Sequence, residues 1–317
     1  MGNLSCQCMS EQSSETHVEV EAVGKSKLTY SPLIPFENTI DLPCLPFALN
    51  IAQLPISQCV ISVWNSLPPF PYKNFETVSN WKTIKLADNS IYQGEFEGIL
   101  PQGRGVQAFE DGSLAEGHWV AGKLEGLCRV IYSNGEHFQG TFQNGKVNGF
   151  GFLVSEHGAR YEGQWLNEKQ HGMGIEKWPD GAEYSGGFRD GCKHGHGVFK
   201  WLDGSCFTGE FSKNNIEGKG YYKWSDGREY VGDWLENKMH GFGKFTWPDG
   251  RVYEGEYKSD KKNGIGTMTK PNGKIFKGPW ANGKKHGIGT IVESNTQKRG
   301  RWVKGKRVEW INDLAFS

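Results

Sequence analysis

The chain has 317 residues, enough for one long domain or two compact ones, and its formal net charge is zero, which argues against a general nucleic-acid binder. Glycine is frequent, with 44 residues, and it is accompanied by 12 Trp, 11 Tyr and 18 Phe. Disordered glycine-rich chains lack aromatic residues, so this composition excludes a wholly disordered chain and favours β-structure with many tight turns. Seven irregularly spaced cysteines without a secretory signal predict a reducing, intracellular compartment.

The first residues resemble an N-myristoylation signal. Gly2 follows Met1 and precedes small or polar residues, although the strict pattern has Ser or Thr where this chain has Cys6. Cys6 and Cys8 offer thiols for palmitate, and a second acyl chain converts marginal membrane binding into stable anchoring. We therefore expect residues 1–31 to be an acylated flexible leash. The alternative is a disordered tail whose cysteines are incidental.

An apolar, proline-rich segment follows at residues 32–80. Residues 42–72 carry no charge, but six prolines interrupt them, so we expect no transmembrane helix. We expect the segment to be largely irregular and to pack on the N-terminal edge of the domain that follows, because an open sheet edge needs a cover. The alternative is a segment that binds a partner.

One glycine then recurs every 23 residues, and an aromatic residue follows it two positions later. This regular spacing is the mark of a repeat architecture. A tenth copy, Gly300 with Trp302, comes one residue early. The nine regular pairs are Gly94/Phe96, Gly117/Trp119, Gly140/Phe142, Gly163/Trp165, Gly186/Phe188, Gly209/Phe211, Gly232/Trp234, Gly255/Tyr257 and Gly278/Trp280.

Each repeat has the pattern of a β-hairpin. The residues around the glycine alternate with period two, as in a strand. Asn144-Gly145 is a hairpin-turn dipeptide, and Pro179-Asp180-Gly181 fits a type I turn followed by a left-handed glycine. Asn89 holds the same turn position before the first repeat, which predicts a half-hairpin there. The strand order is therefore a meander.

Counting outward from the two-residue turn at Asn144-Gly145 predicts which residues pair. It sets Gly140 opposite Gly149 and Phe138 opposite Gly151. Aromatic rings then lie beside glycines on one face, where each ring fills the space that the glycine leaves empty. The other face, which carries residues such as Glu162, is expected to be partly solvated.

These units resemble MORN (membrane occupation and recognition nexus) repeats, over residues 92–302. The resemblance implies a long twisted sheet, a scaffold or targeting role, and in some members contact with phospholipid. MORN arrays also occur fused to lipid kinases and lysine methyltransferases, but only about fifteen residues follow Trp302, so we expect no catalytic domain here. The resemblance is carried by the segments 161–165, 171–174 and 178–181.

The predicted fold is all-β: an elongated, twisted, single-layer antiparallel meander of repeated hairpins with a largely irregular N-terminal segment. The expected organisation is a leash at 1–31, the apolar segment at 32–80, the repeat array at 81–310 and a tail at 311–317. The array contains nine 23-residue units from residue 92, together with partial terminal copies.

Two sets of residues are candidates for binding a partner or lipid. Trp178, Trp201, Trp224 and Trp247 recur at 23-residue intervals on the aromatic face, where they serve either as packing between hairpins or as a partner groove. Residues 251–317 hold 15 Lys and Arg against 6 Asp and Glu. Lys261, Lys262, Lys284 and Lys285 belong to this basic end, which would touch either anionic lipid or the acidic half of another copy.

No pattern indicates catalysis. Cys192, His194 and His196 suggest a metal site, but His194 holds a repeat position and no fourth ligand is evident. We therefore expect no enzyme activity, no metal and no cofactor. The sequence predicts a scaffold at the cytoplasmic face of the plasma membrane or cell cortex, which recruits proteins, and no binding of nucleic acid. The alternatives are a module that binds anionic phospholipid directly and a targeting subunit of a separate enzyme; a homo-oligomer would form through the array ends.

Overall fold

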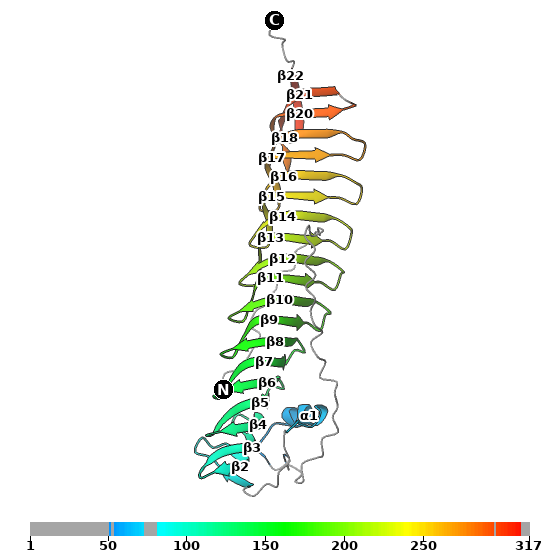
Figure 1. Cartoon of the computed structure of the whole chain (residues 1–317). Helices are drawn as coiled ribbons and strands as arrows, with labels where there is room; N and C mark the ends of the chain where they lie inside the picture. The colour runs from blue at the N-terminus through cyan, green and yellow to red at the C-terminus, as the bar shows by residue number, and fades with distance from the viewer. Residues whose placement is uncertain (1–50, 52–53, 73–80, 295, 312–317) are drawn as a thin grey trace. The chain divides into compact units, whose positions relative to one another are not determined.

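The strands follow one another in a single meander in the computed structural model, which describes residues 51, 54–72, 81–294 and 296–311 (Figure 1). These residues contain one α-helix and 22 strands, which form one open sheet with antiparallel pairing. The all-β antiparallel meander predicted from the repeats is confirmed. Gly2, Cys6 and Cys8 lie outside the described residues.

The described residues divide into two compact units. The first unit comprises the described residues up to Pro179 together with Arg189–Gly191. The second unit comprises Asp180–Phe188, which is most of β10, and the described residues from Cys192 onward. Elements of the first unit are α1 (Gln58–Ser66), β1 (Lys82–Lys85), β2 (Ile91–Glu97), β3 (Leu100–Ala108), β4 (Leu114–Val120), β5 (Lys123–Ile131), β6 (His137–Gln143), β7 (Lys146–Val154), β8 (Arg160–Leu166) and β9 (Lys169–Lys177).

The second unit contains the later repeats. Its elements are β10 (Glu183–Arg189), β11 (Cys192–Lys200), β12 (Cys206–Ser212), β13 (Asn215–Lys223), β14 (Glu229–Leu235), β15 (Lys238–Thr246), β16 (Val252–Lys258), β17 (Lys261–Thr269), β18 (Ile275–Ala281), β19 (Lys284–Lys285), β20 (Gly287–Glu293), β21 (Thr296–Val303) and β22 (Lys306–Ile311). Both β19 and β20 pair with β18, so they are two parts of one interrupted strand.

The tight turns have the backbone geometry that their sequences predict. Asn144 and Gly145 both have positive φ, 51° and 79°, as a type I′ hairpin turn requires. Asn89 also has a positive φ of 66°. It lies in the turn between β1 and β2, and these two strands pair with each other. The half-hairpin predicted before the first repeat is therefore confirmed.

The register across the tight turns differs from the prediction. Gly140 lies opposite Gly151 instead of Gly149, and Phe138 lies opposite Leu153 instead of Gly151. A register shift between Gly140 and Phe142 causes the difference, because the extra residues of a bulge displace every pair beyond it. Counting from the turn assumes an unbroken ladder, so it fails at this bulge.

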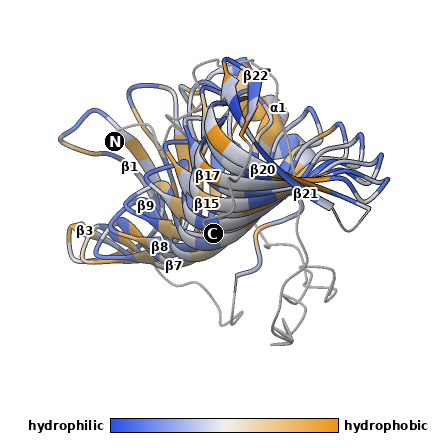
Figure 2. Cartoon of the chain, turned by 90° about the horizontal axis from the view of Figure 1, so that it is seen from above, coloured by the Kyte–Doolittle hydropathy of each residue, from blue (hydrophilic) through white to orange (hydrophobic). Residues whose placement is uncertain are grey.

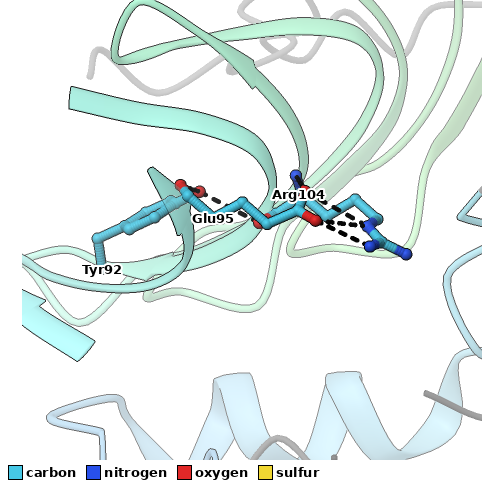
Figure 3. Close-up of polar contacts among 3 residues, drawn as sticks. All are labelled: Tyr92, Glu95 and Arg104. Atoms are coloured by element: carbon cyan, nitrogen blue, oxygen red, sulfur yellow. Dashed lines mark hydrogen bonds and ion pairs between the residues drawn. The ribbon is translucent and has the colours of Figure 1, made fainter. Parts of the chain in front are cut away.

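A polar side chain near each of several bulges accepts a hydrogen bond from a backbone N–H group on the neighbouring strand. Glu95 accepts from the N–H group of Arg104 and also pairs with its guanidinium group at 2.8 Å (Figure 3). In a later repeat, Gln164 accepts from the N–H group of Met173 at 2.7 Å. Glu95 and Gln164, on the face expected to be partly solvated, therefore help to hold neighbouring strands together.

The core consists of aromatic rings that lie over paired glycines. A Cβ atom added at Gly163 would lie 2.5 Å from the Tyr161 hydroxyl and 2.6 Å from the Cα atom of Gly174. The Tyr161 and Trp165 rings meet edge to face, with their centroids 5.2 Å apart. Buried and more exposed residues alternate along strands such as β8 and β16, as expected when one face is buried. Figure 2 shows hydrophilic and hydrophobic stretches along the strands. The prediction that rings fill the space above glycines is confirmed.

Part of the apolar N-terminal segment covers the opposite face of the first unit. Helix α1, capped by the Ser57 hydroxyl, which accepts a hydrogen bond from the N–H group of Val60, lies over β3, β4 and β5. Val60 is fully buried against Val106, Leu114 and Ile131. The segment was expected to be largely irregular and to pack on the sheet edge, whereas its described part contains α1 and packs on a face of the sheet.

A buried ion pair on the same face holds the end of this segment. The guanidinium group of Arg129 lies 3.6 Å from the carboxylate of Glu116, and both side chains are nearly inaccessible to solvent. Arg129 also donates to the carbonyl oxygen of Pro68 at 3.0 Å, and its charge lies over the Phe70 ring. Tyr72 donates to the carbonyl oxygen of Gly105 at 3.4 Å. The covering segment is thus held by polar contacts as well as by apolar burial.

Candidate functional site

The repeats present two chemically different faces. The aromatic face carries the rings that lie over the glycine pairs, such as Tyr161 and Trp165 in the first unit and Tyr253 and Trp280 in the second. The opposite face carries the alternate residues of the same strands. Since neighbouring residues of a strand point to opposite faces, each candidate residue can be assigned to a face from its place in the strand.

The tryptophans at the turns do not stack directly on one another in the second unit. The ring of Tyr222 lies between Trp201 and Trp224, with centroids 4.7 Å and 5.8 Å away, and Phe245 lies between Trp224 and Trp247 at 5.1 Å and 4.2 Å. The rings form a continuous ladder along the aromatic face. Trp224 is buried, while Trp201 and Trp247 are partly exposed.

The remaining tryptophan of the set, Trp178, follows β9 in the first unit. Its side chain is partly exposed. Packing between hairpins, one of the two roles considered for these tryptophans, explains the row of ring contacts in the second unit. The Trp247 ring, at the end of this row, is partly exposed and is therefore accessible to a partner.

The four candidate lysines do not form one patch. Lys261 and Lys284 are exposed on the opposite face. Lys262 and Lys285, their next neighbours in β17 and β19, are half-buried on the aromatic face. The structure therefore divides the set into two pairs with different surroundings, in agreement with strand alternation.

Aromatic rings surround the ammonium group of Lys262. Its Nζ atom lies 4.5 Å from the ring centroid of Trp247, 5.2 Å from that of Tyr253 and 5.6 Å from that of Trp280. Lys285 lies one repeat further, with its Nζ atom 4.2 Å from the ring centroid of Phe276 and 6.0 Å from that of Trp280. Both distances to Trp280 fall within the range of cation–π attraction, so this ring is shared by the two charges.

Burial disfavours the charged form of both ammonium groups. It lowers the pKa of Lys262 to about 8, with a further contribution from the positive charge of Arg251. Burial also lowers the pKa of Lys285, and Lys270 and Lys274 add to the effect. Lysine is rarely buried. Lys193 of β11, at the same repeat position, is also buried beside the rings of Tyr184 and Phe188, so lysines at this position differ from the surface charges.

The opposite face of the second unit exposes apolar side chains at one position in each of three repeats. Phe242 is 55% exposed, Ile265 is 62% exposed and Ile288 is 50% exposed. Each lies between the two glycines of a Gly-x-Gly pair. Sequence reasoning missed this column, although the spacing of 23 residues and the period of two would have placed all three side chains on the face opposite to the rings.

A hollow lies beside the first turns of the first unit. This hollow of about 410 Å³ is lined by acidic and aromatic residues, among them Asp88, Glu110 and Asp111. Their carboxylates accept hydrogen bonds from Ser90, Asn89 and the N–H group of Ser113, respectively. These carboxylates therefore stabilise turns.

Residues 192–196 place Cys192, His194 and His196 on alternate positions of β11, and no group of three or more metal-ligating side chains occurs among the described residues. Within the described part of the chain, no helix has the length and apolar character that crossing a membrane requires.

Solved structures give only distant likenesses. The TCP domain of SAS-4 from Drosophila melanogaster, solved with a proline-rich motif of Ana2, is 12% identical with a TM-score of 0.24; the match covers 68% of this chain and 99% of that chain. The G-box domain of the microcephaly protein CPAP is 12% identical with a TM-score of 0.26, over 64% of this chain and 100% of that chain. Scores this low assign neither shared architecture nor function.

Family models give the decisive comparison. No curated protein matches the chain. The model of the MORN repeat matches nine consecutive segments, at residues 92–114, 116–137, 138–159, 161–183, 184–206, 207–227, 230–250, 253–275 and 276–292. These segments make up more than half of the chain, and they coincide with the hairpins described above. The chain belongs to the MORN repeat family.

Proposed function

We propose that this protein is a non-enzymatic scaffold that holds protein partners at a membrane or at the cortical cytoskeleton. The supporting observation is the exposed apolar column of Phe242, Ile265 and Ile288. Large apolar side chains exposed at the same position of successive repeats are typical of interaction surfaces, although Glu256 of β16 lies between Phe242 and Ile265. Here they recur on a repeated sheet, which offers an extended surface instead of an enclosed pocket, so protein partners suit it better than small substrates.

The tether in this proposal is the N-terminal sequence. Gly2 would carry myristate, and Cys6 and Cys8 would carry palmitate. One acyl chain gives weak, reversible membrane binding and two give stable anchoring. The scaffold would therefore sit at the cytoplasmic face of a membrane, with the repeats available to partners.

The two parts of the proposal can be tested together in cells. Gly2→Ala should move the protein from the membrane fraction to the soluble fraction while its partners still co-purify with it. Cys6→Ser combined with Cys8→Ser should leave weak, reversible membrane binding. A Gly2→Ala variant that stays on membranes would show that acylation is not the anchor.

The binding part has its own variant. Replacing Phe242, Ile265 and Ile288 by Ser should remove co-purifying partners and leave membrane attachment unchanged, because these substitutions leave Gly2, Cys6 and Cys8 intact. Thermal unfolding of the variant provides the control for folding. Partners that persist at full yield would contradict the assignment of this column.

Direct binding to anionic phospholipid is a second candidate function. Exposed lysines such as Lys261 and Lys284 favour it, since each cation near an anionic surface contributes about 1 kcal/mol. Unacylated recombinant protein should then float with phosphatidylserine vesicles and detach at high salt. Proximity labelling would also reveal whether the partner is an enzyme, as a targeting subunit requires.

A further inference from the structure

Lysine occupies one mostly apolar position of the aromatic face in three repeats, and two of these repeats, with Lys262 and Lys285, are consecutive. The equivalent residues in four earlier repeats are Leu124, Val147, Ile216 and Met239, all of them buried. Lys193 is a third lysine of this position, but its counterparts one repeat away on either side are uncharged. Only Lys262 and Lys285 place lysine in consecutive repeats. Lysine at an apolar core position opposes folding, and such local conflicts are typical of functional sites.

No carboxylate of the described residues forms an ion pair with either ammonium group. The nearby Arg251 is already engaged by Asp249 at 2.7 Å, and Lys274 is engaged by Glu293 at 2.6 Å. The charges that act on Lys262 and Lys285 are positive, and aromatic rings provide the attraction. A ligand with negative charge would therefore supply what the protein itself does not.

We propose that Lys262 and Lys285, together with the Trp247 and Trp280 rings, form a binding site for an extended acidic segment of a protein partner. This inference rests on the proposed scaffold function and names the chemistry of one partner. One carboxylate of the segment would meet Lys262 and a second would meet Lys285. The intervening residues would lie against the aromatic rings.

The spacing of the two lysines suits an extended peptide. Each repeat contributes two strands, and strands lie about 4.8 Å apart, so equivalent residues of consecutive repeats are separated by roughly 10 Å. A polyproline II segment advances about 3.1 Å per residue with three residues per turn, which brings every third side chain to the same side at roughly 9 Å. Acidic residues at every third position would therefore meet both ammonium groups.

A membrane surface suits this pair less well than a peptide does. Headgroups form a broad layer that attracts projecting cations, whereas Lys262 and Lys285 are half-buried among rings. The lysines that project freely, Lys261 and Lys284, are on the opposite face. An extended chain can reach between rings, as in the aromatic-lined grooves that bind proline-rich peptides.

The test uses the full-length protein and a labelled peptide of about 18 residues that repeats Glu-Pro-Ala, so that every third residue is acidic. A peptide with Gln in place of Glu is the control ligand. The Glu peptide should bind in a salt-dependent way, and the Gln peptide should not. Lys262→Met and Lys285→Met should each weaken binding about tenfold, as expected for the loss of a hydrogen bond to a charged group.

The chain offers a matched control pair. Lys261→Met and Lys284→Met remove the same number of charges from adjacent positions on the opposite face, so affinity for the Glu peptide should stay within about twofold. Absence of binding to the Glu peptide, or equal losses in both pairs of variants, would overturn the proposal. So would flotation with phosphatidylserine vesicles that depends on Lys262 and Lys285 alone.

Failure of this site would not remove the scaffold function. If partners still co-purify with the Lys262→Met, Lys285→Met double variant and are lost only when the apolar column is replaced, the scaffold stands and the acidic-segment site is wrong. If neither set of substitutions changes the partners, the proposed function fails as well. Circular dichroism and the Tm of each variant verify that it is folded.

Discussion

The first and the second unit are built from the same hairpin, but the faces opposite to their aromatic rings make different contacts. In the first unit, α1 buries Val106, Leu114 and Ile131 on the opposite face. In the second unit, the position of Ile131 carries polar residues in four consecutive repeats, namely Lys200, Lys223, Thr246 and Thr269. A repeat thus keeps its rings and glycines for folding, while the variable positions between them decide what each region contacts.

Disruption of the cover in the first unit should have the largest effect. Arg129→Met leaves the buried Glu116 carboxylate without its partner and removes the contact with Pro68. Loss of one member of a buried ion pair should lower the free energy of unfolding by about 4 kcal/mol. Urea unfolding measures the change, with Arg251→Met as an exposed control. A loss below about 1 kcal/mol would mean that the pair does not hold the segment.

The glycine pairs are shared by both units, so they should respond alike. A Cβ atom at Gly163 in the first unit would collide with the Cα atom of Gly174, and one at Gly255 in the second unit would collide with the Cα atom of Gly266. Each Gly→Ala change should cost about 3 kcal/mol through overpacking. Gly191→Ala, which meets no atom within 4 Å, is the control and should cost roughly 1–2 kcal/mol for its left-handed backbone. Unequal losses in the two units would show that their cores differ.

The pH should affect the second unit's site in a defined direction. Since the pKa of Lys262 is lowered to about 8, raising the pH from about 7 to about 9 deprotonates it and should weaken binding of the Glu peptide about tenfold. Arg251, Lys270 and Lys274 also face this region and keep it positive. Fluorescence anisotropy across this range provides the measurement, and an unchanged affinity would contradict a role for Lys262.

The lowered pKa of Lys262 does not itself destabilise the protein over this pH range. The folded-state pKa of Lys262 lies below its unfolded value of about 10.5, so the unfolded chain binds more protons between these two values. The contribution of Lys262 to stability therefore rises as the pH increases through this window. A thermal unfolding series at each pH separates the two effects.

The smallest effect concerns stability in the second unit. Lys262→Met restores the residue type found at Met239 and should raise the free energy of unfolding by about 1 kcal/mol, because a half-buried charge is removed. This sign is opposite to that of Arg129→Met in the first unit. A destabilised Lys262→Met protein would indicate that cation–π attraction outweighs the desolvation of the ammonium group.

Most features of the fold could be predicted from the 23-residue spacing of the repeats. It gave the meander, the turns at Asn144-Gly145 and the half-hairpin after Asn89, because these depend on local backbone geometry. It could not give the shift between Gly140 and Phe142, since a bulge leaves no mark in the spacing of glycines. Strand alternation alone places Lys261 and Lys262 on opposite faces. The burial of Lys262, however, depends on rings from neighbouring repeats, such as Trp247.

The helix was missed for a different reason. Prolines on both sides of residues 58–66 favour irregular structure, whereas the short apolar pattern at Val60, Val63, Trp64 and Leu67 follows helical spacing. A second signal was the replacement of repeat residues by apolar ones at Leu114 and Ile131. Neither signal alone shows that the helix and the sheet face cover one another.

Hydrogen–deuterium exchange of the full-length protein, with and without the Glu peptide, tests most directly whether the two regions divide their roles as inferred. The peptide should slow exchange in β15 to β19, around Trp247, Lys262 and Lys285, and leave β3 to β5 unchanged because α1 already covers them. The effect should disappear in the Lys262→Met, Lys285→Met protein. Protection confined to the first unit, or protection that survives both substitutions, would contradict the account.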